Sequence, residues 1–334
     1  MSAAPSSVVF GAGSWGTALA VHLAHAGHRV RLWGRDAALV DTLREQRVNA
    51  TYLPGIELPG LVEPVASFEA AAGARFAVFA VPSHGLRAVA RKAAAVLPAD
   101  AILISATKGL EEGTLDRMSL VLGAELPGHA VVALSGPSFA LELARRQPTA
   151  IVAASADAAA VEAVQAEFRA GYLRLYGSDD VIGVELGGAL KNVIAIAAGV
   201  VEGTGLGHNA LAALITRGLA EISRLAVAAG GRRDTLAGLS GLGDLVLTCT
   251  GALSRNRHVG IELGRGRALG DVLGDMKMVA EGVRTASAAL ALGERHGVEL
   301  PIACQMADVM AGRRTPVEAL EELMLRRQRH ESDG

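Results

Sequence analysis

The sequence predicts two domains, an α/β domain followed by an all-helical domain. Up to residue 176, short β runs alternate with helical segments, which is the pattern of an α/β sheet covered by helices. After residues 177–180, every periodic segment has the spacing of a helix. A chain of 334 residues is also long enough to bury two cores. We therefore expect domains at 1–178 and 179–334.

The first functional motif is a glycine-rich turn between a strand and a helix. A β run is predicted to end at Gly11, a helix to begin near Ser14 and to stop at Gly27, and a second β run to span residues 29–33. This order of strand, turn, helix and strand is typical of a Rossmann-type dinucleotide-binding domain. The alternative is a glycine-rich turn in an unrelated α/β unit.

Each glycine of this turn has a predicted role. Gly11 permits the tight turn, Gly13 lets the backbone approach a pyrophosphate, and Gly16 lets the helix pack close to the strand. The phosphates would lie at the helix N-terminus, where backbone N–H groups point outward. The motif therefore predicts a bound dinucleotide.

The end of the second β run bears on which dinucleotide binds. Sites specific for NAD usually place a carboxylate there to hold the ribose hydroxyls, but here Gly34 and Arg35 occupy the position and Asp36 follows late. Arg35 can pair with a 2′-phosphate and stack on adenine. The sequence favours NADP(H), or the use of both dinucleotides. The alternative is that Arg35 is a solvated surface side chain.

Residues 49–60 contain two Pro-Gly pairs and other residues typical of turns. No helical or strand period runs through them. We expect a loop over the surface.

Three later β runs end in small or polar residues. The second leads to Lys108, and the third passes through Gly136 and Ser138 into a helix whose free N–H groups could hold oxygen atoms. Ligands of doubly wound sheets bind at the carboxyl ends of the strands. The three runs lie within residues 75–82, 101–110 and 130–142.

The helix predicted over residues 181–201 is apolar almost all round, so we expect it to be buried. It carries Lys191 and Asn192, and a buried ammonium costs several kcal/mol or so unless another group pairs with it. Gly187 and Gly188, one turn earlier, leave space beside the lysine. The partner of Lys191 is either a carboxylate from elsewhere in the core, or a ligand or reacting oxygen.

Two carboxylates are candidates for this region. Asp244 follows a glycine-rich turn, where it could cap a helix, orient Lys191 or accept from a substrate hydroxyl. Glu281 could cap a helix or hold a ribose. The sequence leaves these alternatives open.

A pair of arginines is predicted at a helix start. Ser254 has the character of an N-cap, which places Arg255 and Arg257 in the first turn. The helix dipole disfavours cations there, by about a few tenths of a kcal/mol each. A bound phosphate would reverse that effect, with both guanidinium groups converging on one anion. The alternative is that both reach into solvent.

Composition excludes several classes of function. The net charge is −2, so no nucleic-acid partner is indicated. The two cysteines, Cys249 and Cys304, have no zinc or disulfide spacing, and the histidines have no metal spacing, so we expect no metal and a reducing cytoplasm. The N-terminus has no basic region, and we expect no later segment to supply the run of about 18 apolar residues that spans a bilayer.

Together these motifs resemble those of the bacterial NAD(P)-dependent sn-glycerol-3-phosphate dehydrogenases. The resemblance covers nearly the whole chain, and its motifs are long and in order. They lie at residues 11–18, 32–35, 49–54, 81–84, 106–110, 135–140, 186–199, 210–221, 241–250 and 254–257. The resemblance implies a helical second domain of the 6-phosphogluconate dehydrogenase C-terminal type. It also implies reversible reduction of dihydroxyacetone phosphate to sn-glycerol 3-phosphate, a precursor of phospholipids, and is compatible with a homodimer.

The resemblance also implies roles for individual residues. Lys191 would be the catalytic proton donor in reduction and the acceptor in oxidation. Substrate contacts would come from Lys108, Gly136, Ser138, Lys191, Asp244, Ser254, Arg255 and Asn256. Cofactor contacts would come from Gly11, Gly13, Ser14, Trp15, Gly16, Arg35, Lys108, Ala140, Arg255, Val279 and Glu281. This chain departs from the family pattern at Trp15, Ser138 and Ala280, which bears on cofactor contacts rather than on the reaction.

Two other functions are consistent with parts of the sequence. A β-hydroxyacid or 6-phosphogluconate type dehydrogenase of related architecture also uses a lysine on a central helix. A dinucleotide-binding sensor without turnover would explain the glycine motif, but it would gain nothing from a buried Lys191 beside an anion site.

Overall fold

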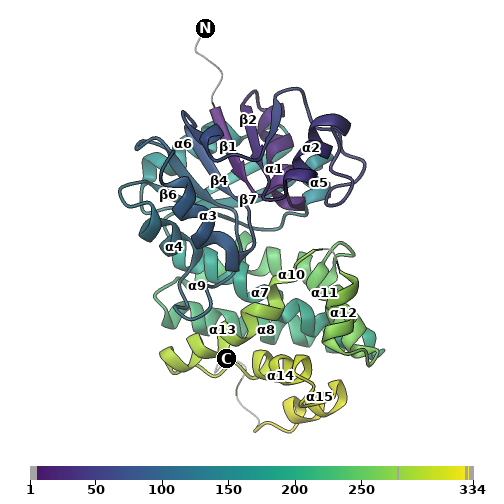
Figure 1. Ribbon diagram of the computed structural model, residues 1–334. Helices are drawn as coiled ribbons and strands as arrows, with labels where there is room; N and C mark the ends of the chain where they lie inside the picture. The colour runs from purple at the N-terminus through teal and green to yellow at the C-terminus, as the bar shows by residue number, and fades with distance from the viewer. Residues whose placement is uncertain (1–5, 277, 328–329, 331–334) are drawn as a thin grey trace. The chain divides into compact units, whose positions relative to one another are not determined.

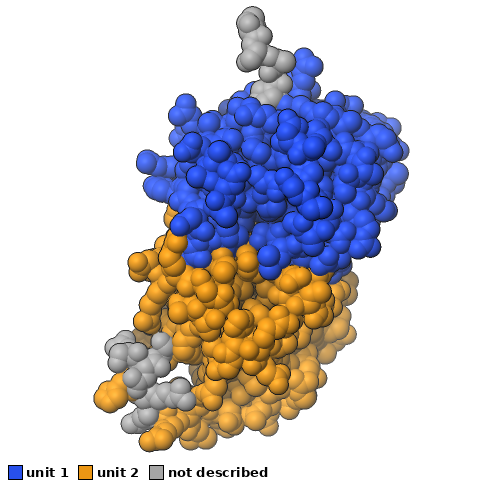
Figure 2. All heavy atoms as spheres, turned by 90° about the vertical axis from the view of Figure 1, so that its left-hand side faces the viewer, with its two compact units in different colours: residues 1–107, 118–181 blue, residues 108–117, 182–334 orange. Residues whose placement is uncertain are grey.

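The computed structural model describes residues 6–276, 278–327 and 330. The chain divides into two compact units, unit 1 with residues 1–107 and 118–181, and unit 2 with residues 108–117 and 182–334 (Figure 2). The predicted boundary after residue 178 leaves residues 108–117 in the first domain, whereas these residues pack in unit 2. Residues 1–5, on which the expectation of no leader partly rests, lie outside the described residues.

The described residues of unit 1 form an eight-stranded sheet with the order β3-β2-β1-β4-β5-β6-β7-β8 (Figure 1). In the first six positions of the sheet, β3-β2-β1-β4-β5-β6, each strand is parallel to its neighbours. Strand β7 is antiparallel to β6, and β8 is parallel to β7. The sheet is therefore mixed, with its last two strands reversed. The strands are β1 Ser6–Phe10, β2 Arg29–Trp33, β3 Val62–Val65, β4 Phe76–Phe79, β5 Ile102–Ser105, β6 Val131–Ser135, β7 Thr149–Ala154 and β8 Leu173–Ser178.

Helices cover both faces of this sheet, because successive strand residues point to opposite faces. Val9 of β1 packs in one core with α1, α5 and α6, whereas its neighbours Val8 and Phe10 pack in another with α3 and α4. The helices are α1 Ser14–His25, α2 Ala37–Gln46, α3 Leu86–Ala93, α4 Met118–Glu125, α5 Ala140–Ala144 and α6 Ala158–Phe168, with 3-10 turns η1 Glu69–Ala71 and η2 Ser83–Gly85.

The loop at residues 49–60 lies on the surface of unit 1, as expected, with Ala50, Thr51, Pro54 and Gly55 exposed, but buried side chains anchor it. Asn49 is fully buried, and its Nδ2 donates to the Ala12 carbonyl at 2.9 Å and to Thr17 Oγ1 at 2.8 Å. Leu53 is buried as well. The asparagine amide thus satisfies a backbone carbonyl of the glycine-rich turn, and this ties the loop to it.

Unit 2 is helical in its described residues. The helices are α7 Val181–Gly203, α8 His208–Ala228, α9 Arg233–Ala237, α10 Asp244–Thr250, α11 Arg255–Gly264, α12 Leu269–Asp275, α13 Glu281–His296, α14 Pro301–Met310 and α15 Pro316–Met324. A short π-helix, η3 Leu239–Gly243, precedes α10. Helix α15 begins with a capping box between Thr315 and Glu318.

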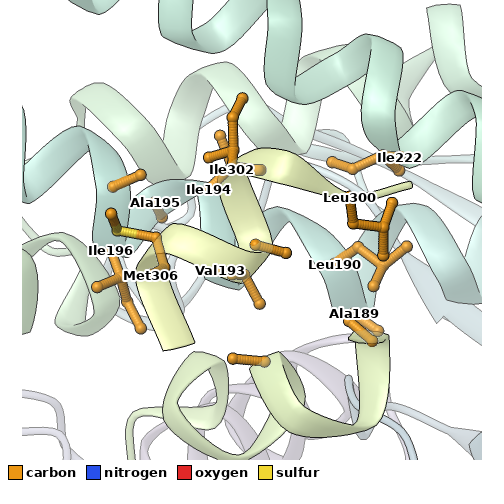
Figure 3. Packing of buried hydrophobic residues seen from close by; sticks show 14 of the residues in the cluster. Ala189, Leu190, Val193, Ile194, Ala195, Ile196, Ile222, Leu300, Ile302 and Met306 are labelled. Carbon is orange, nitrogen blue, oxygen red and sulfur yellow. The ribbon is translucent and has the colours of Figure 1, made fainter. Parts of the chain in front are cut away.

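Helix α7 is the core of unit 2, and every residue from Gly183 to Val200 is buried. Its glycines allow close backbone contact, since a Cβ on Gly199 would lie 2.0 Å from the Arg257 carbonyl oxygen of α11. Figure 3 shows the apolar side chains of α7, such as Ile194, gathered with Ile302 and Met306 of α14. The predicted burial of this helix is confirmed.

Length and composition alone would also let α7 cross a bilayer. This differs from the expectation that no segment of the chain is long and apolar enough to span a bilayer. Within the described residues, however, 83% of its 18-residue apolar window is buried, as in the core helix of a globular protein.

Candidate functional site

The glycine-rich turn has the geometry that a pyrophosphate requires. Gly11 has φ +119°, and a Cβ there would lie 2.7 Å from the Ala80 carbonyl oxygen. A Cβ on Gly16 would lie 1.8 Å from the Gly11 carbonyl oxygen, so α1 packs directly on the turn. Gly13 faces open space, and no side chain of the described residues caps α1. The first N–H groups of α1 are therefore available to an anion.

The end of β2 presents an arginine rather than a carboxylate. Asp36 is the N-cap of α2, and its Oδ1 accepts from the Ala38 N–H at 3.0 Å. Arg35 is exposed. The Asp36 carboxylate therefore caps α2, and Arg35 is the side chain beside the end of β2 that could contact a cofactor.

The turn after β6 is tightly constrained. Gly136 has φ +128°, and a Cβ there would lie 3.0 Å from the Ile151 Cα. The Ser138 hydroxyl donates to the Gly136 carbonyl at 3.0 Å. The following helix, α5, begins at Ala140 and has only five residues.

The predicted site residues divide between the two units. Unit 1 holds Gly11, Gly13, Ser14, Trp15, Gly16, Arg35, Gly136, Ser138 and Ala140. Unit 2 holds Lys108, Lys191, Asp244, Ser254, Arg255, Asn256, Val279 and Glu281. Lys108 was expected with the strand edge of the first domain, but it packs in unit 2.

A buried carboxylate joins two lysines in unit 2. Asp244 Oδ1 accepts from Lys191 Nζ, and Oδ2 accepts from Lys108 Nζ, each at 2.6 Å. The side chains of Lys191 and Asp244 are 8% and 1% exposed, and that of Lys108 is 19% exposed. Within the described residues the partner of Lys191 is therefore a core carboxylate, and the contact is consistent with the alternative in which Asp244 orients this lysine.

Thr248 completes this cluster, and sequence reasoning missed it. Lys191 Nζ donates to Thr248 Oγ1 at 2.7 Å, and the Thr248 hydroxyl donates to the Asp244 backbone carbonyl at 2.6 Å. Thr248 lies four residues after Asp244, one turn along α10. That spacing was the available signal.

The surroundings of Lys191 shift its pKa. The pKa is lowered to about 8: burial lowers it most, the Asp244 carboxylate opposes this, and the nearby charge of Lys108 adds to the lowering. Burial raises the pKa of the adjacent Cys249 thiol to about 12, which keeps that thiol neutral. Lys191 is thus an ammonium that can release its proton near neutral pH.

The π-helix η3 directly precedes Asp244 and packs against α7 beside this cluster. A Cβ on Gly187 of α7 would lie 2.5 Å from the Ser240 carbonyl oxygen, so only glycine permits this approach. Asp244 is the first residue of α10, and the N-cap position is Gly243. The alternative that Asp244 serves as a helix cap is wrong, because its carboxylate binds the two lysines instead.

The start of α11 separates the two arginines. Ser254 is the N-cap and accepts from the Arg257 N–H at 3.2 Å, as predicted. Arg257 pairs with Glu202 of α7, so the expectation that both guanidinium groups converge on one anion is wrong. Arg255 remains exposed as a residue, but burial of its guanidinium lowers the pKa of this group, and the nearby charge of Glu281 opposes that shift.

Asn256 links three helices. Its Nδ2 donates to Asn192 Oδ1 at 2.9 Å, and its Oδ1 accepts from the Gly282 N–H at 2.9 Å. Glu281 is the first residue of α13, and Val279, which is exposed, lies two residues before it. Asn256 therefore fixes the start of α13, where these two predicted cofactor residues lie.

Two other kinds of site are possible in principle, a metal site and a cavity. Among the described residues, no group of three His, Cys, Asp or Glu side chains could hold a metal ion. An open cavity of about 770 Å³ lies in unit 1 along α6, β7 and β8, and none of the predicted site residues lines it. This cavity is therefore separate from the candidate site.

Comparisons with known proteins cover nearly the whole chain. The family described as NAD-dependent glycerol-3-phosphate dehydrogenase matches with its N-terminal part at residues 7–161 and its C-terminal part at 180–321. A relative from Geobacter sulfurreducens, named glycerol-3-phosphate dehydrogenase (NAD(P)+), is 52% identical over 95% of this chain and 96% of its own. A relative of the same name from Acidobacterium capsulatum is 50% identical over 97% of this chain and 98% of its own. The crystal structure of a glycerol-3-phosphate dehydrogenase from Coxiella burnetii has a TM-score of 0.93 at 37% identity, covering 97% of this chain and 99% of that one.

Proposed function

The chain belongs to the NAD-dependent glycerol-3-phosphate dehydrogenase family, and we propose that it reduces dihydroxyacetone phosphate to sn-glycerol 3-phosphate with NAD(P)H. The observation that carries this proposal beyond family membership is the buried pair of Lys191 and Asp244. A general acid with a pKa near working pH, beside a second cation, suits the reduction of a ketone in a phosphorylated substrate.

In the proposed mechanism, Lys191 acts on the carbonyl oxygen of the substrate. A nicotinamide bound at this site would supply the hydride for the carbonyl carbon. The Lys191 ammonium stabilises the negative charge that develops on the oxygen and transfers its proton there, which produces the hydroxyl. Asp244 and Thr248 hold Nζ in place through bonds of 2.6 and 2.7 Å. In oxidation the neutral amine accepts the proton.

The remaining predicted contacts belong to the same proposal. The N–H groups at the start of α1 would hold the pyrophosphate, together with the backbone beside Gly13. Arg35 would contact the adenosine end of the cofactor and favour a 2′-phosphate. Lys108 and Arg255 supply cations for the phosphate of the substrate. The residues Gly136, Ser138, Ser254 and Asn256 are proposed substrate contacts, and Ser14, Trp15, Ala140, Val279 and Glu281 are proposed cofactor contacts.

The function is tested by NAD(P)H oxidation with dihydroxyacetone phosphate and with unphosphorylated dihydroxyacetone. We expect rapid oxidation only with the phosphate ester, and faster turnover at low concentrations of NADPH than of NADH. If Arg35→Ala oxidises NADPH and NADH at the same rates as the unmodified enzyme, Arg35 does not determine the cofactor preference. Activity on hydroxyacids instead would indicate the related dehydrogenases, and no oxidation with any carbonyl compound would indicate a sensor.

The pH dependence should follow Lys191. Because its pKa is lowered to about 8, the ammonium needed for reduction is lost as pH rises through about 8, whereas the amine needed for oxidation is gained over the same range. We predict that kcat for reduction falls and kcat for oxidation rises across this window. Profiles of both directions at saturating substrates test this, and parallel profiles would contradict it.

Arg255 should bind the substrate phosphate. We predict that Arg255→Met raises KM for dihydroxyacetone phosphate by about 10–100-fold, the equivalent of one charge-assisted hydrogen bond. Arg257→Met is the matched control, because Arg257 lies in the same turn but is paired with Glu202. If steady-state kinetics show the same increase in KM for both variants, Arg255 does not bind the substrate phosphate specifically.

The proposal includes a cytoplasmic homodimer. Both cysteines are free, which suits a reducing compartment. Light scattering of the purified protein at several concentrations tests the dimer, and a monomer at every concentration would exclude it. Fractionation of the producing cells tests the compartment.

A further inference from the structure

We propose that Arg117 and Glu185 are positioning residues for the reaction. Their ion pair holds residues 108–117, which we call the inserted hairpin, so that Lys108 stays on Asp244 beside Lys191. This inference rests on the proposed function and assigns a role to two residues outside the predicted site.

The inserted hairpin is a closed structure with Lys108 and Arg117 at its two ends. Leu110 and Arg117 form an antiparallel bridge. The Glu111 N–H donates to the Asp116 carbonyl at 2.9 Å, and the Leu115 N–H donates to the Glu111 carbonyl at 3.0 Å. A displacement at one end of so short a hairpin is therefore transmitted to the other.

Both ends of the inserted hairpin are fastened inside unit 2. At one end, Lys108 binds Asp244, and Leu110 is buried in the core of unit 2. At the other end, Arg117 Nη1 donates to Glu185 Oε2 at 2.5 Å, and the two side chains are only 16% and 7% exposed. Breaking a buried ion pair leaves an uncompensated charge, so this fastening should be strong.

A third ion pair of the hairpin is weaker than these two. Glu112 pairs with Arg284 at 3.0 Å, but both side chains are about half exposed, where such pairs add little. The Arg117–Glu185 pair is thus shielded from water, as the Lys108–Asp244 pair is at the other end of the hairpin.

The pair also relates the hairpin to the catalytic lysine. Glu185 and Lys191 both lie on α7, a buried helix, six residues apart. Arg117 therefore binds the hairpin to the helix that carries Lys191, and Asp244 accepts hydrogen bonds from both lysines. Small displacements of charged groups in a reacting site cost large factors in rate.

The test compares Arg117→Met and Glu185→Gln with the unmodified enzyme. We expect kcat for dihydroxyacetone phosphate reduction to fall by about tenfold in each, with KM for NAD(P)H within about twofold. The double variant should be no worse than either single variant, because the two residues act as one pair. Arg117→Lys keeps the cation and should recover part of the loss.

A pH profile distinguishes positioning from a merely structural role. The charged or titratable groups that act on Lys191 are Asp244, Lys108 and Cys249, and Lys108 lowers its pKa. If the hairpin loosens and Lys108 moves away, the fall in reduction kcat shifts to higher pH. Faster hydrogen exchange confined to the inserted hairpin should accompany this shift.

Glu262→Gln is the matched control, since Glu262 is a similarly shielded carboxylate of unit 2 that pairs with Arg265 and Arg267. Its kcat and pH profile should not change. Unchanged kcat and an unshifted profile in both test variants would overturn the proposal. If Arg117→Met fails to fold, the isosteric Glu185→Gln decides the question. An inactive unmodified enzyme would instead refute the proposed function.

Discussion

Replacing Lys191 by alanine should lower kcat for dihydroxyacetone phosphate reduction by about 10²–10⁴-fold, the contribution of a positioned general acid. The loss is expected because Lys191 is the buried ammonium of this cluster whose pKa is lowered to about 8, and it is held by Asp244 and Thr248. Affinity for NAD(P)H should stay within about twofold, since the glycine-rich turn lies in unit 1. Steady-state kinetics and fluorescence titration of the dinucleotide measure the two quantities.

Two further variants sharpen this test. Lys191→Met keeps most of the side-chain volume, so a similar loss of kcat would assign the effect to the ammonium rather than to a cavity. Lys92→Ala removes an exposed lysine of α3 and should leave kcat unchanged. Near-normal turnover of both Lys191 variants would remove this residue from the mechanism.

The sequence predicted features that depend on neighbouring residues along the chain. Gly11, Gly13 and Gly16 lie within one turn and its helix, so their spacing alone specifies their packing. The burial of Lys191 followed from the apolar residues on all sides of its own helix. Ser254 could be predicted as a cap because a cap acts on the next three residues.

Features that depend on distant pairs could not be predicted in this way. Arg257 is neutralised by Glu202, 55 positions earlier, and nothing local to Arg257 indicates that partner. Likewise, Asn49 is buried because it reaches Ala12 and Thr17, although its own neighbours are typical of a surface turn.

The position of the inserted hairpin is a third case. Residues 108–117 follow a strand of unit 1 but pack in unit 2, through contacts of Lys108 and Arg117 with residues 136 and 68 positions away. A single boundary in the sequence cannot describe a segment that leaves one unit and returns to it. Such features arise from tertiary packing, which a single sequence reports only weakly.

Replacing Asp244 by asparagine should impair both stability and turnover. The carboxylate is 1% exposed and accepts from two ammonium groups, so its loss leaves Lys108 and Lys191 close together with no opposing charge between them. Breaking a buried ion pair typically costs about 3–5 kcal/mol of the free energy of unfolding. Deprotonation of Lys191 would relieve part of that cost.

The same substitution should shift the pH profile in a defined direction. Asp244 raises the pKa of Lys191, so without it the pKa falls below about 8 and the ammonium needed for reduction is lost at lower pH. We predict that kcat for reduction at neutral pH falls by about 10²-fold, because protonation and orientation of Lys191 are lost together. This shift is opposite to that expected from loosening the inserted hairpin, where Lys108 moves away and the pKa rises.

Asp308→Asn provides the control for stability, because it also removes a carboxylate that pairs with arginines of unit 2, but at a partly exposed position. Its cost in urea unfolding should stay below about 1 kcal/mol. If Asp244→Asn unfolds at the same urea concentration as this control and keeps the pH profile of the unmodified enzyme, then Asp244 does not hold the charge of Lys191. The two lysines would in that case have to be stabilised by the protein around them, and the cluster could not be the source of the acid that the reduction needs.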